Sequence, residues 1–340
     1  MAFQLQQFFH FVSKITFRRA INAFLVFMSY HVSKLIRKPI HWGMPIALSI
    51  EPTTSCNLRC PECPSGLRSF TRSTGMLDEK LFTKIINELH HTLSYLTFYF
   101  QGEPYLHKKI INMIEYAHQK KIYTATSTNG HYLTSEMARK TVESGLDRLI
   151  ISIDGTTQEV YESYRVGGSL EKVIEGTKEV VSWKKKLNAR TPYIILQFLV
   201  VAPNEHQIED LYALAKKLEV DDVLLKTAQI YNYEKGSDLI PHSEKYSRYK
   251  KNKDGSYTIK NKLINHCWKM WHSCVVTWDG KVVPCCFDKD ASHVLGHAQQ
   301  QHFQTIWKNT SYKNFRKTIL RSRSEIDICK NCSEGTKVWT

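Results

Sequence analysis

The sequence is poor in cysteine and lacks a long uninterrupted run of apolar residues. Its 340 residues include nine cysteines, too few for a small disulfide-stapled scaffold, and they gather in two groups whose short spacings suit metal ligation. The longest apolar stretch, from about residue 20 to residue 32, is interrupted by polar side chains and falls short of the ~20 residues that span a bilayer. No small-residue cleavage site follows it. We therefore expect a globular, cytoplasmic protein with neither a signal peptide nor a membrane-spanning helix.

Acidic residues are absent from residues 1–40. This segment carries six Lys and Arg side chains interleaved with seven phenylalanines, so residues 1–44 are predicted to form a basic, aromatic-rich amphipathic helix. Two interpretations are open: an interfacial helix drawn to anionic lipid at the inner face of the membrane, or a leader helix packed on the body of the protein. We favour packing, because cationic aromatic helices often simply pack.

Recognisable nucleic-acid-binding motifs are also absent. The formal net charge of +15 would suit nucleic acid, an anionic membrane face or an acidic substrate. Basic side chains spread over solvated helices give the same total, and nothing in the sequence makes the charge specific for nucleic acid. We therefore expect no nucleic-acid partner.

Strand-like and helix-like segments alternate from residue 45 onward. Residues 77–89 place apolar side chains three and four apart, and residues 135–142 form a helical pattern that begins with a cap and stops at Gly145. The predicted strands are residues 46–51, 96–100, 122–126, 149–153, 193–201 and 223–226. Six βα units require parallel strands joined by right-handed crossovers. The predicted fold class is α/β, a partial (β/α)6 TIM-like barrel over residues 45–233.

Three cysteines lie in one short loop after the first predicted strand: Cys56, Cys60 and Cys63. Three thiolates can hold three irons of a [4Fe-4S] cluster and leave the fourth iron open for a ligand. An open coordination position is what separates catalytic from structural metal sites. Half of a zinc site, or three unrelated thiols, are the alternatives.

Further polar motifs each follow one of the next predicted strands. Gln101-Gly102-Glu103 follows the second strand, Asn129 follows the third, and Ser152 lies near the end of the fourth. The carboxyl ends of barrel strands meet at one rim, where α/β barrels build their sites. A glycine at position 102 would let the backbone approach a ligand closely, and Glu103 would add negative charge for an ammonium group. An ordinary turn is the alternative for this motif.

The cysteine run CxxxCxxC resembles the cluster motif of the radical S-adenosylmethionine (radical SAM) superfamily. Gln101-Gly102-Glu103 resembles the GGE motif of that family, with Gln101 in place of the first glycine. The resemblance implies that the open iron binds S-adenosylmethionine and that one electron splits it to a 5′-deoxyadenosyl radical, which abstracts hydrogen from a substrate. Glu62 is a departure, because the family usually carries an aromatic or aliphatic residue just before the third cysteine.

The same resemblance implies four sets of contacts with S-adenosylmethionine. Gln101-Gly102-Glu103 would meet the methionine amine, Ser152 the ribose and Arg165 the carboxylate, while Asn129 would line the cofactor cleft. The planar donor fork of an arginine suits a carboxylate. A surface salt bridge is the alternative for Arg165, and a turn before glycine is the alternative for Asn129.

A second cysteine group follows a basic connector, residues 234–262, in which a turn is predicted at Lys253-Asp254-Gly255. Residues 263–340 resemble the SPASM/twitch extensions of radical SAM enzymes, and a hairpin at residues 278–281 would bring distant ligands together. Four cysteines would close a second, auxiliary [4Fe-4S] cluster there: Cys267, Cys285, Cys329 and Cys332. A structural zinc site with four cysteine ligands is the alternative.

Two cysteines, Cys274 and Cys286, are left over. Alternation in a strand would turn Cys286 away from Cys285, so we expect it to bind no metal, whereas Cys274 could replace one of the four. Two complete auxiliary clusters beside the first would need eleven cysteines, and nine are present. The count favours two clusters in all.

The predicted function is that of a radical SAM enzyme acting on a peptide, a protein or a small molecule. The resemblance implies an external electron donor of the flavodoxin or ferredoxin type. The alternative is an iron-sulfur protein that transfers electrons or binds a partner on the same scaffold without cleaving S-adenosylmethionine. The sequence identifies no general acid or base.

Overall fold

The computed structural model describes residues 2–335, with side chains from residue 7 onward. Residue 1 of the predicted N-terminal segment and residues 336–340 of the predicted C-terminal segment lie outside the described residues. The helices are α1 (Ala2–Ser13), α2 (Phe17–Ile36), α3 (Pro64–Leu67), α4 (Glu79–Leu89), α5 (Ile110–Gln119), α6 (Ser135–Glu143), α7 (Gln158–Tyr164), α8 (Leu170–Lys186), α9 (Ile208–Leu218), α10 (Lys269–His272), α11 (Phe303–Lys308), α12 (Thr310–Ser322) and α13 (Asp327–Lys330).

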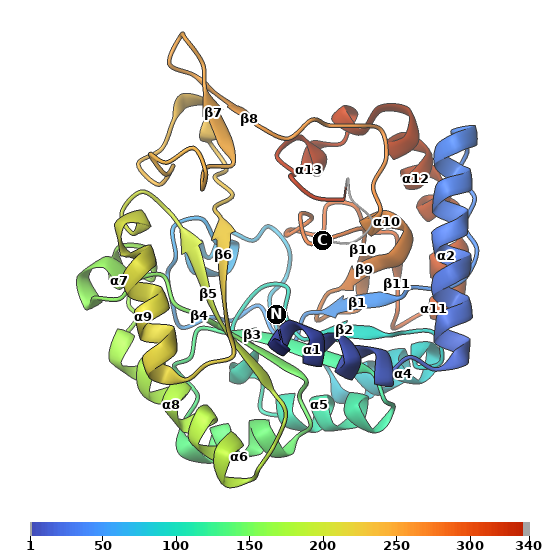
Figure 1. The fold of residues 1–340 in the computed structure, drawn as a ribbon. Helices are drawn as coiled ribbons and strands as arrows, with labels where there is room; N and C mark the ends of the chain where they lie inside the picture. Colours follow the sequence, from blue (N-terminus) through green and yellow to red (C-terminus); the bar gives the residue numbers. More distant parts are fainter. Residues whose placement is uncertain (1, 336–340) are drawn as a thin grey trace.

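Six parallel strands form the body of the protein, in the order in which they occur along the chain. They are β1 (Ala47–Ile50), β2 (Tyr95–Thr97), β3 (Tyr123–Thr128), β4 (Arg148–Ser152), β5 (Tyr193–Val200) and β6 (Asp222–Thr227). Helices α4, α5, α6, α8 and α9 lie along the outside of these strands (Figure 1). The predicted α/β partial barrel is confirmed.

The C-terminal extension continues the barrel sheet. Its strands are β9 (Ser273–Val276), β10 (Lys281–Val283) and β11 (Gly296–His297). β9 pairs with β1 in parallel, β10 pairs with β9 in antiparallel as the predicted hairpin requires, and the sheet has nine strands in all within the described residues. The sequence predicts an appended extension, whereas the structure joins it to the open edge of the first barrel strand.

Local sequence determines where the barrel helices begin and which face they bury. In α4, the Asp78 carboxylate accepts hydrogen bonds from the backbone amides of Lys80 and Leu81, which caps two of the unpaired N–H groups of the first turn. The residues of α4 that recur three and four apart are all buried: Leu81, Phe82, Ile85, Ile86 and Leu89. This apolar stripe fixes the rotation of the helix against the sheet.

The connector between β6 and the extension carries a small hairpin of its own. Strands β7 (Tyr249–Lys251) and β8 (Tyr257–Ile259) pair in antiparallel, and they project from one end of the molecule (Figure 1). The predicted turn lies between them, where Asp254 accepts a hydrogen bond from the amide of Ser256 and Gly255 adopts φ +86°. The connector is therefore ordered structure that can contribute to a site.

Helices α1 and α2 dock on the barrel through polar contacts. The Asp147 carboxylate, just before β4, accepts hydrogen bonds from Lys14 and from His10 Nε2 (2.6 Å). The Arg19 guanidinium donates to the carbonyls of Lys14, His90 and Lys120. The N-terminal segment packs on the protein through these faces, but the single helix predicted for it is two helices, because the chain leaves the helix at residues 14–16 between α1 and α2. No helix within residues 2–335 has the length and hydrophobicity needed to cross a bilayer.

We expect Asp147→Asn to destabilise the protein by about 3 kcal/mol, because it leaves the Lys14 ammonium largely buried without its anion. Burial acts to raise the pKa of Asp147, but His10 and Lys14 outweigh it and lower that pKa. A carboxyl with a lowered pKa stabilises the folded state above its unfolded pKa of about 3.9, and this contribution is lost as the pH falls through the folded pKa.

Urea midpoints measured between about pH 3 and pH 7 should therefore separate wild type from Asp147→Asn most at neutral pH and least in acid. Glu143→Gln, which removes an exposed ion pair with Arg139, is the control and should stay within about 0.5 kcal/mol of wild type. Equal midpoints for Asp147→Asn and wild type at neutral pH would show that the ion pair does not anchor α1.

Candidate functional site

The three-cysteine loop lies at the carboxyl end of β1, on the rim of the barrel. The backbone turns so that the amide of Cys63 donates to the carbonyl of Cys60 at 3.3 Å, and α3 begins directly after Cys63. Cys60 is 6% exposed and Cys56 and Cys63 are half-buried. Together with Leu58 and Tyr164 they pack in a small apolar cluster separate from the main core.

Each thiol in this loop has a neighbour from a different segment of the barrel. Gln101 Oε1 lies 3.9 Å from Cys63 Sγ, and Asn129 Nδ2 lies 3.9 Å from Cys56 Sγ. Arg165 Nη1 lies 3.9 Å from the third thiol, that of Cys60. The structure therefore brings Gln101 and Asn129, from the loops after β2 and β3, and Arg165, at the end of α7, around the three thiols. The positions of Gln101 and Asn129 after predicted strands led us to expect this, and the resemblance implied it for Arg165.

Burial makes thiolates costly at this position. It raises the pKa of Cys56 to about 11, and it raises the pKa of Cys60 against the opposing charge of Arg165. A metal ligand is the thiolate form of cysteine, so a bound cation must compensate for this cost. The three thiols fit the three irons of a cluster that leaves a fourth iron open.

Gly102 holds the second motif against the cysteine loop. Its φ is +73°, and a Cβ added there would lie 2.2 Å from the carbonyl oxygen of Thr53 and 2.8 Å from that of Ser55. The neighbouring amide of Glu103 donates to Ser55 O at 2.8 Å, and the amide of Gly102 donates to Ser65 Oγ at 2.9 Å. The glycine is therefore required for close approach to the protein's own backbone, where we had expected approach to a ligand.

The Glu103 carboxylate is buried and faces inward. Its Oε1 accepts hydrogen bonds from Thr128 Oγ1 (2.7 Å) and from the amide of Tyr105 (3.1 Å), and its Oε2 accepts one from the amide of Asn129 (2.7 Å). These bonds tie the loop after β2 to the loop after β3. Glu103 thus positions Asn129, and its predicted contact with the methionine amine stays a prediction.

Arg165 forms a buried ion pair with Asp154. Arg165 Nε lies 2.5 Å from Asp154 Oδ2, and the carboxylate also accepts a hydrogen bond from the amide of Leu199 at 2.6 Å. Burial alone would lower the pKa of Arg165, but Asp154 and Cys60 raise it well above its ordinary value. The guanidinium is therefore a fixed cation beside the cysteine loop, and the surface salt bridge considered for Arg165 is wrong because Asp154 is fully buried.

Sequence reasoning missed the role of Asp154 in this pair. It comes two residues after Ser152, the last residue of β4, and its ion pair holds the Arg165 side chain at the rim of the barrel. The available signal was an acidic residue at a strand end with an arginine eleven positions later. Ser152 is 6% exposed, and its hydroxyl has no hydrogen-bond partner among the described residues, so its predicted contact with ribose stays a prediction.

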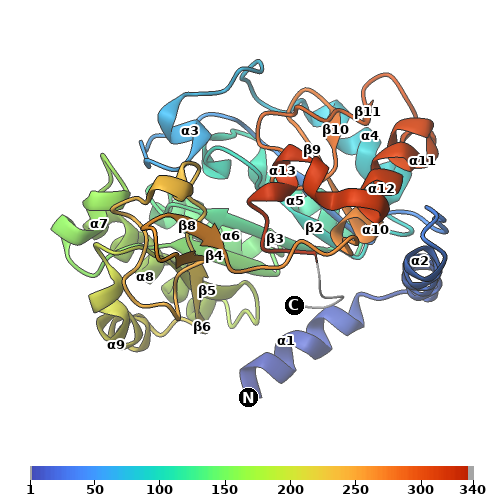
Figure 2. The ribbon, with the colours of Figure 1, turned by 90° about the horizontal axis from the view of Figure 1, so that it is seen from above.

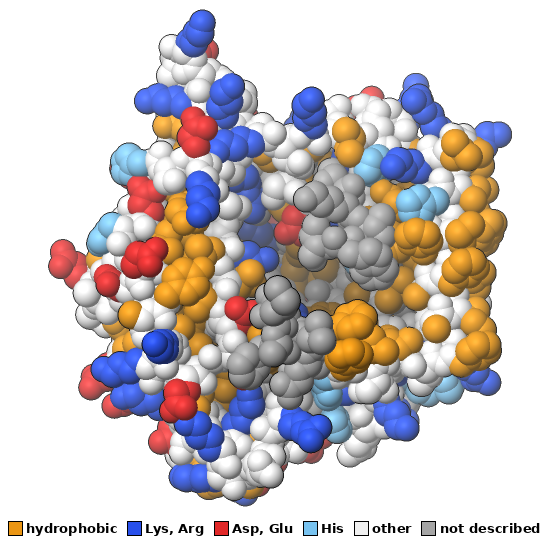
Figure 3. Space-filling model, viewed as in Figure 1, with side chains coloured by type: hydrophobic (Ala, Val, Ile, Leu, Met, Phe, Trp, Pro, Cys, Tyr) orange, Lys and Arg blue, Asp and Glu red, His pale blue; other side chains and the backbone are white. Residues whose placement is uncertain are grey.

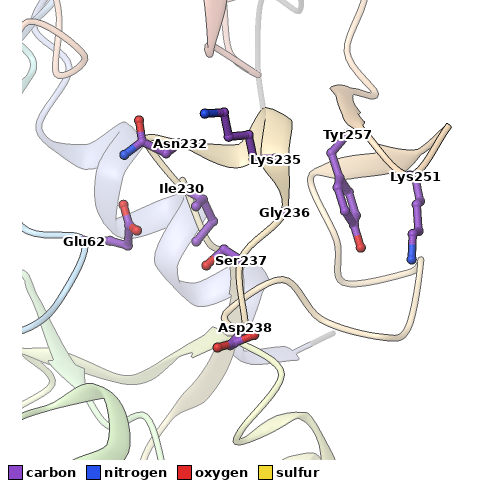
Figure 4. A pocket seen from close by; sticks show the side chains of 10 residues that line it. Glu62, Ile230, Asn232, Lys235, Gly236, Ser237, Asp238, Lys251 and Tyr257 are labelled. Carbon is purple, nitrogen blue, oxygen red and sulfur yellow. The ribbon is translucent and has the colours of Figure 1, made fainter.

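Glu62 joins the cysteine loop to the segment after β6. Its Oε2 accepts a hydrogen bond from the amide of Tyr231 at 3.0 Å, and burial raises the pKa of this carboxyl. It borders an open cavity of about 680 Å³ whose other walls come from the connector. Figure 4 shows Glu62 and Asn232 on one side of this cavity and Tyr257 and Lys251 on the other. The departure at position 62 therefore places a carboxylate at the wall of a polar cavity.

The four cysteines predicted as auxiliary ligands line a single small cavity in the extension: Cys267, Cys285, Cys329 and Cys332. Most of the other side chains around it are apolar, among them Met270 and Phe315. Burial raises the pKa of Cys332 to about 12, and burial with the neighbouring thiols raises the pKa of Cys285 well above its ordinary value. The arrangement fits a group that binds all four thiolates and supplies positive charge.

Arg323 lies against this group of thiols, and sequence reasoning did not identify it. Its side chain is fully buried, and its Nη2 donates to Cys332 Sγ at 3.1 Å and to the carbonyl of Glu334 at 2.7 Å. Burial alone would lower the pKa of Arg323, but Cys267, Cys332 and Cys329 raise it. A permanently charged guanidinium thus faces three of the four thiols.

We expect Arg323→Gln to lower the reduction potential of the auxiliary cluster by roughly 50 mV, equivalent to about 1 kcal/mol for one electron. The reduced cluster carries one more negative charge than the oxidised cluster. Removing the cation and its hydrogen bond to sulfur therefore disfavours the reduced cluster and lowers its potential. The measurement is an anaerobic redox titration followed by EPR. It uses a protein in which Cys56, Cys60 and Cys63 are replaced by alanine, so that only the auxiliary cluster gives a signal. Lys330→Gln, an exposed change beside Cys329, is the control; equal shifts in both variants would contradict the assignment to Arg323.

The two remaining cysteines lie outside the four-thiol cavity. Cys274 is on β9 opposite Leu48 of β1 and is buried in the main core. Cys286 is exposed, with its Sγ 3.9 Å from Lys269 Nζ. Within residues 2–335 no three His, Cys, Asp or Glu side chains converge on one ion position. A [4Fe-4S] cluster binds each thiolate to a different iron, so convergence on one point is not what it requires.

Comparisons with known proteins agree with both cysteine groups. Residues 50–215 match the model of the radical SAM superfamily, and residues 267–333 match the SPASM model, described as an iron-sulfur cluster-binding domain. Together the two matches cover more than half of the chain. The chain therefore carries a radical SAM domain followed by a SPASM domain. Its predicted cofactors, S-adenosylmethionine and [4Fe-4S] clusters, are the ones that these two domains imply; which cysteines hold them stays a prediction.

Relatives of this radical SAM protein span nearly its whole length. It is 24% identical over 329 residues to the tungsten-containing aldehyde ferredoxin oxidoreductase cofactor-modifying protein of Pyrococcus furiosus, covering 84% of this chain and 86% of the relative. Its fold resembles BtrN in complex with AdoMet and 2-DOIA, with a TM-score of 0.55, 19% identity, and coverage of 88% and 96% of the two chains. It also resembles Streptococcus suis SuiB bound to S-adenosylmethionine, with a TM-score of 0.64, 13% identity, and coverage of 91% and 76%.

Proposed function

We propose that this radical SAM protein cleaves S-adenosylmethionine reductively and uses the resulting 5′-deoxyadenosyl radical to abstract hydrogen from an organic substrate. Its three-cysteine loop would hold the first cluster, and the four-thiol cavity would hold the auxiliary cluster. The observation that carries the proposal is the convergence of Gln101, Asn129 and Arg165, each 3.9 Å from a different thiol of the loop.

This convergence supplies the groups that S-adenosylmethionine needs beside an open iron. The Arg165 guanidinium, held by Asp154, is a fixed cation suited to the methionine carboxylate. Ser152 offers a hydroxyl that has no hydrogen-bond partner in the part of the chain that the structure describes, and this group is suited to the ribose. Asn129 is oriented by the Glu103 carboxylate through its backbone amide, so that its side chain remains at the cysteine loop.

When bound, the cluster and S-adenosylmethionine supply the radical chemistry, with the electron coming from an external donor of the flavodoxin or ferredoxin type. The chain's own residues bind, orient and exclude water. Packing of Cys60 against Leu58 and Tyr164 keeps the inner side of the loop dry. The Asp154–Arg165 pair fixes the loop's charged neighbour, because a buried carboxylate leaves the guanidinium one favourable position.

The substrate class stays open between a peptide or protein and a small molecule. The Pyrococcus furiosus relative is named for modifying a cofactor, and SuiB has also been crystallised with the precursor peptide SuiA. The cavity beside Glu62, with Lys235, Asp238 and Lys251 on its walls, favours a substrate with polar or charged groups. Its volume of about 680 Å³ lies within the range of small-molecule sites.

Anaerobic reconstitution with iron and sulfide tests the proposal. Two four-iron clusters would give about eight irons per chain, and dithionite with S-adenosylmethionine should then yield 5′-deoxyadenosine. Bound iron with no affinity for S-adenosylmethionine would instead favour the electron-transferring or partner-binding alternative. Zinc bound in place of iron at both cysteine groups would overturn the proposal.

A further inference from the structure

Helix α2 buries several polar side chains and exposes several apolar ones, the opposite of the usual arrangement in a surface helix. The buried face contains polar residues, including Arg19 at 2% exposure, Asn22, Ser29 and Ser33. Each has an internal partner: Asn22 Nδ2 donates to the carbonyl of Met44 at 3.0 Å, and Ser33 Oγ donates to that of Ile40 at 2.7 Å. These bonds fix the rotation of the helix, because turning it would leave buried polar groups unpaired.

The outward face of α2 is apolar. Phe17 is 80% exposed, Phe24 is 61% exposed and Leu35 is 83% exposed, and Ile21, Leu25 and Ile36 are exposed beside them. Phe8, Phe9 and Val12 of α1 are exposed as well. Figure 3 shows apolar side chains gathered along α2 at the right edge and over α1 nearer the centre. So large an exposed apolar surface is typical of an interaction site.

Cations flank this apolar face at both ends of α2, and residues 1–50 contain no Asp or Glu. Arg18 is exposed at the start of the helix, close to His91, while Lys34 and Lys38 are exposed at its end. The first acidic residue of the sequence is Glu51, which is buried and paired with Arg72. The face therefore combines exposed aromatic and aliphatic side chains with a net positive border.

We propose that α1 and α2 dock the protein on the surface of an anionic phospholipid bilayer. Phe17, Phe24 and Leu35 enter the interface between headgroups and acyl chains, and Arg18, Lys34 and Lys38 meet the lipid phosphates. An interfacial helix needs an apolar face for burial and basic residues for anionic lipid. No helix in the described part of the chain is suited to span a bilayer, so α2 lies along the membrane surface.

Charge favours a bilayer over a second copy of this chain as the occupant of the face. Pairing two α2 faces would bring the cations of one copy next to those of the other, with no acid in residues 1–50 to offset them. An anionic membrane supplies the missing negative charge along the whole face. The α1 part of the face also lies apart from the three-cysteine loop: α1 contacts Tyr123 and Asp147 at the amino ends of β3 and β4, opposite the rim that carries Gln101 and Asn129.

Vesicle flotation with the full chain tests this assignment. We expect wild type to float with vesicles containing about one third phosphatidylglycerol, to float poorly with pure phosphatidylcholine, and to dissociate as salt is raised from about 0.1 M to 1 M. The triple variant Phe17→Ser, Phe24→Ser, Leu35→Ser should lower the partition coefficient at least about tenfold. These side chains are exposed, so the variant should keep its fold and its iron content.

Two further variants keep the test specific. Arg18→Gln, Lys34→Gln, Lys38→Gln should remove the preference for anionic vesicles. Leu187→Ser, Tyr212→Ser changes exposed apolar residues at the end of α8 and on α9, helices that lie on the opposite side of the barrel from α2 (Figure 1 and Figure 2), and this variant should float like wild type. The proposal is overturned if wild type does not bind anionic vesicles. It is also overturned if wild type forms a dimer in solution that the apolar triple variant does not form. Neither result bears on 5′-deoxyadenosine formation, so this proposal and the proposed function fail separately.

Discussion

Replacing Cys60 with alanine is expected to abolish 5′-deoxyadenosine formation and to lower the iron content from about eight to about four per chain. Cys60 is the most buried thiol of its loop, at 6% exposure, so water cannot easily take its place as a ligand. Its Sγ is also the one that faces the Arg165 guanidinium at 3.9 Å. Loss of this ligand removes both an iron-sulfur bond and the sulfur that lies beside the guanidinium, whose ion pair with Asp154 remains.

The four irons that remain in Cys60→Ala show which cluster is lost. They should retain the EPR signal of the auxiliary cluster, because Cys267 and the other three thiols of the extension line a separate cavity. Cys286→Ser is the matched control: it removes an exposed thiol that does not line that cavity, so iron content and cleavage should both stay at the wild-type level. Cleavage that survives in Cys60→Ala would contradict the proposed function.

The barrel could be predicted from the sequence because its signals are local. The strands are short runs rich in apolar or β-branched residues, and the barrel helices carry apolar stripes. A capping side chain begins α4, α6 and α8. The polar motifs could be placed on one rim because parallel strands end at the same edge. Gln101 and Asn129 were therefore expected near the cysteine loop, whereas Arg165 was expected there only from the resemblance to the radical SAM family.

Long-range pairings could not be predicted in this way. The parallel pairing of β1 with β9 joins residues 47–50 to residues 273–276. No local sequence pattern indicates that the free edge of β1 pairs with a strand of the extension. The role of Gly102 was misjudged for a related reason. The backbone that it approaches belongs to Thr53 and Ser55, and only the packed loops reveal that neighbour.

Buried charges were the other omission. Asp154 and Arg323 each lie beside predicted site residues, yet their importance depends on the partner that burial provides. A sequence shows an arginine six positions before Cys329, but it does not show a guanidinium that donates to Cys332 Sγ at 3.1 Å. Charged residues are expected on the surface, so only their exclusion from water makes these two informative.

Gly102→Ala is expected to destabilise the protein by about 3 kcal/mol or more and to prevent loading of the first cluster. The added Cβ would lie 2.2 Å from Thr53 O and 2.8 Å from Ser55 O, and both are backbone atoms that no side-chain rotation can move. The two loops must then separate, which breaks the hydrogen bond from the Glu103 amide to Ser55 O. Anaerobic urea midpoints and iron content per chain measure the two effects.

Gly167→Ala separates this steric effect from backbone strain. Gly167 has φ +77°, close to the +73° of Gly102, but a Cβ added there meets no atom within 4 Å. It should cost only the strain of a left-handed alanine, about 1–2 kcal/mol, and it should leave the iron content near eight. Because the two glycines share a conformation and differ in their surroundings, equal losses in both variants would mean that strain alone matters. A larger loss at Gly102, with about four irons missing, is what close packing of the two loops requires.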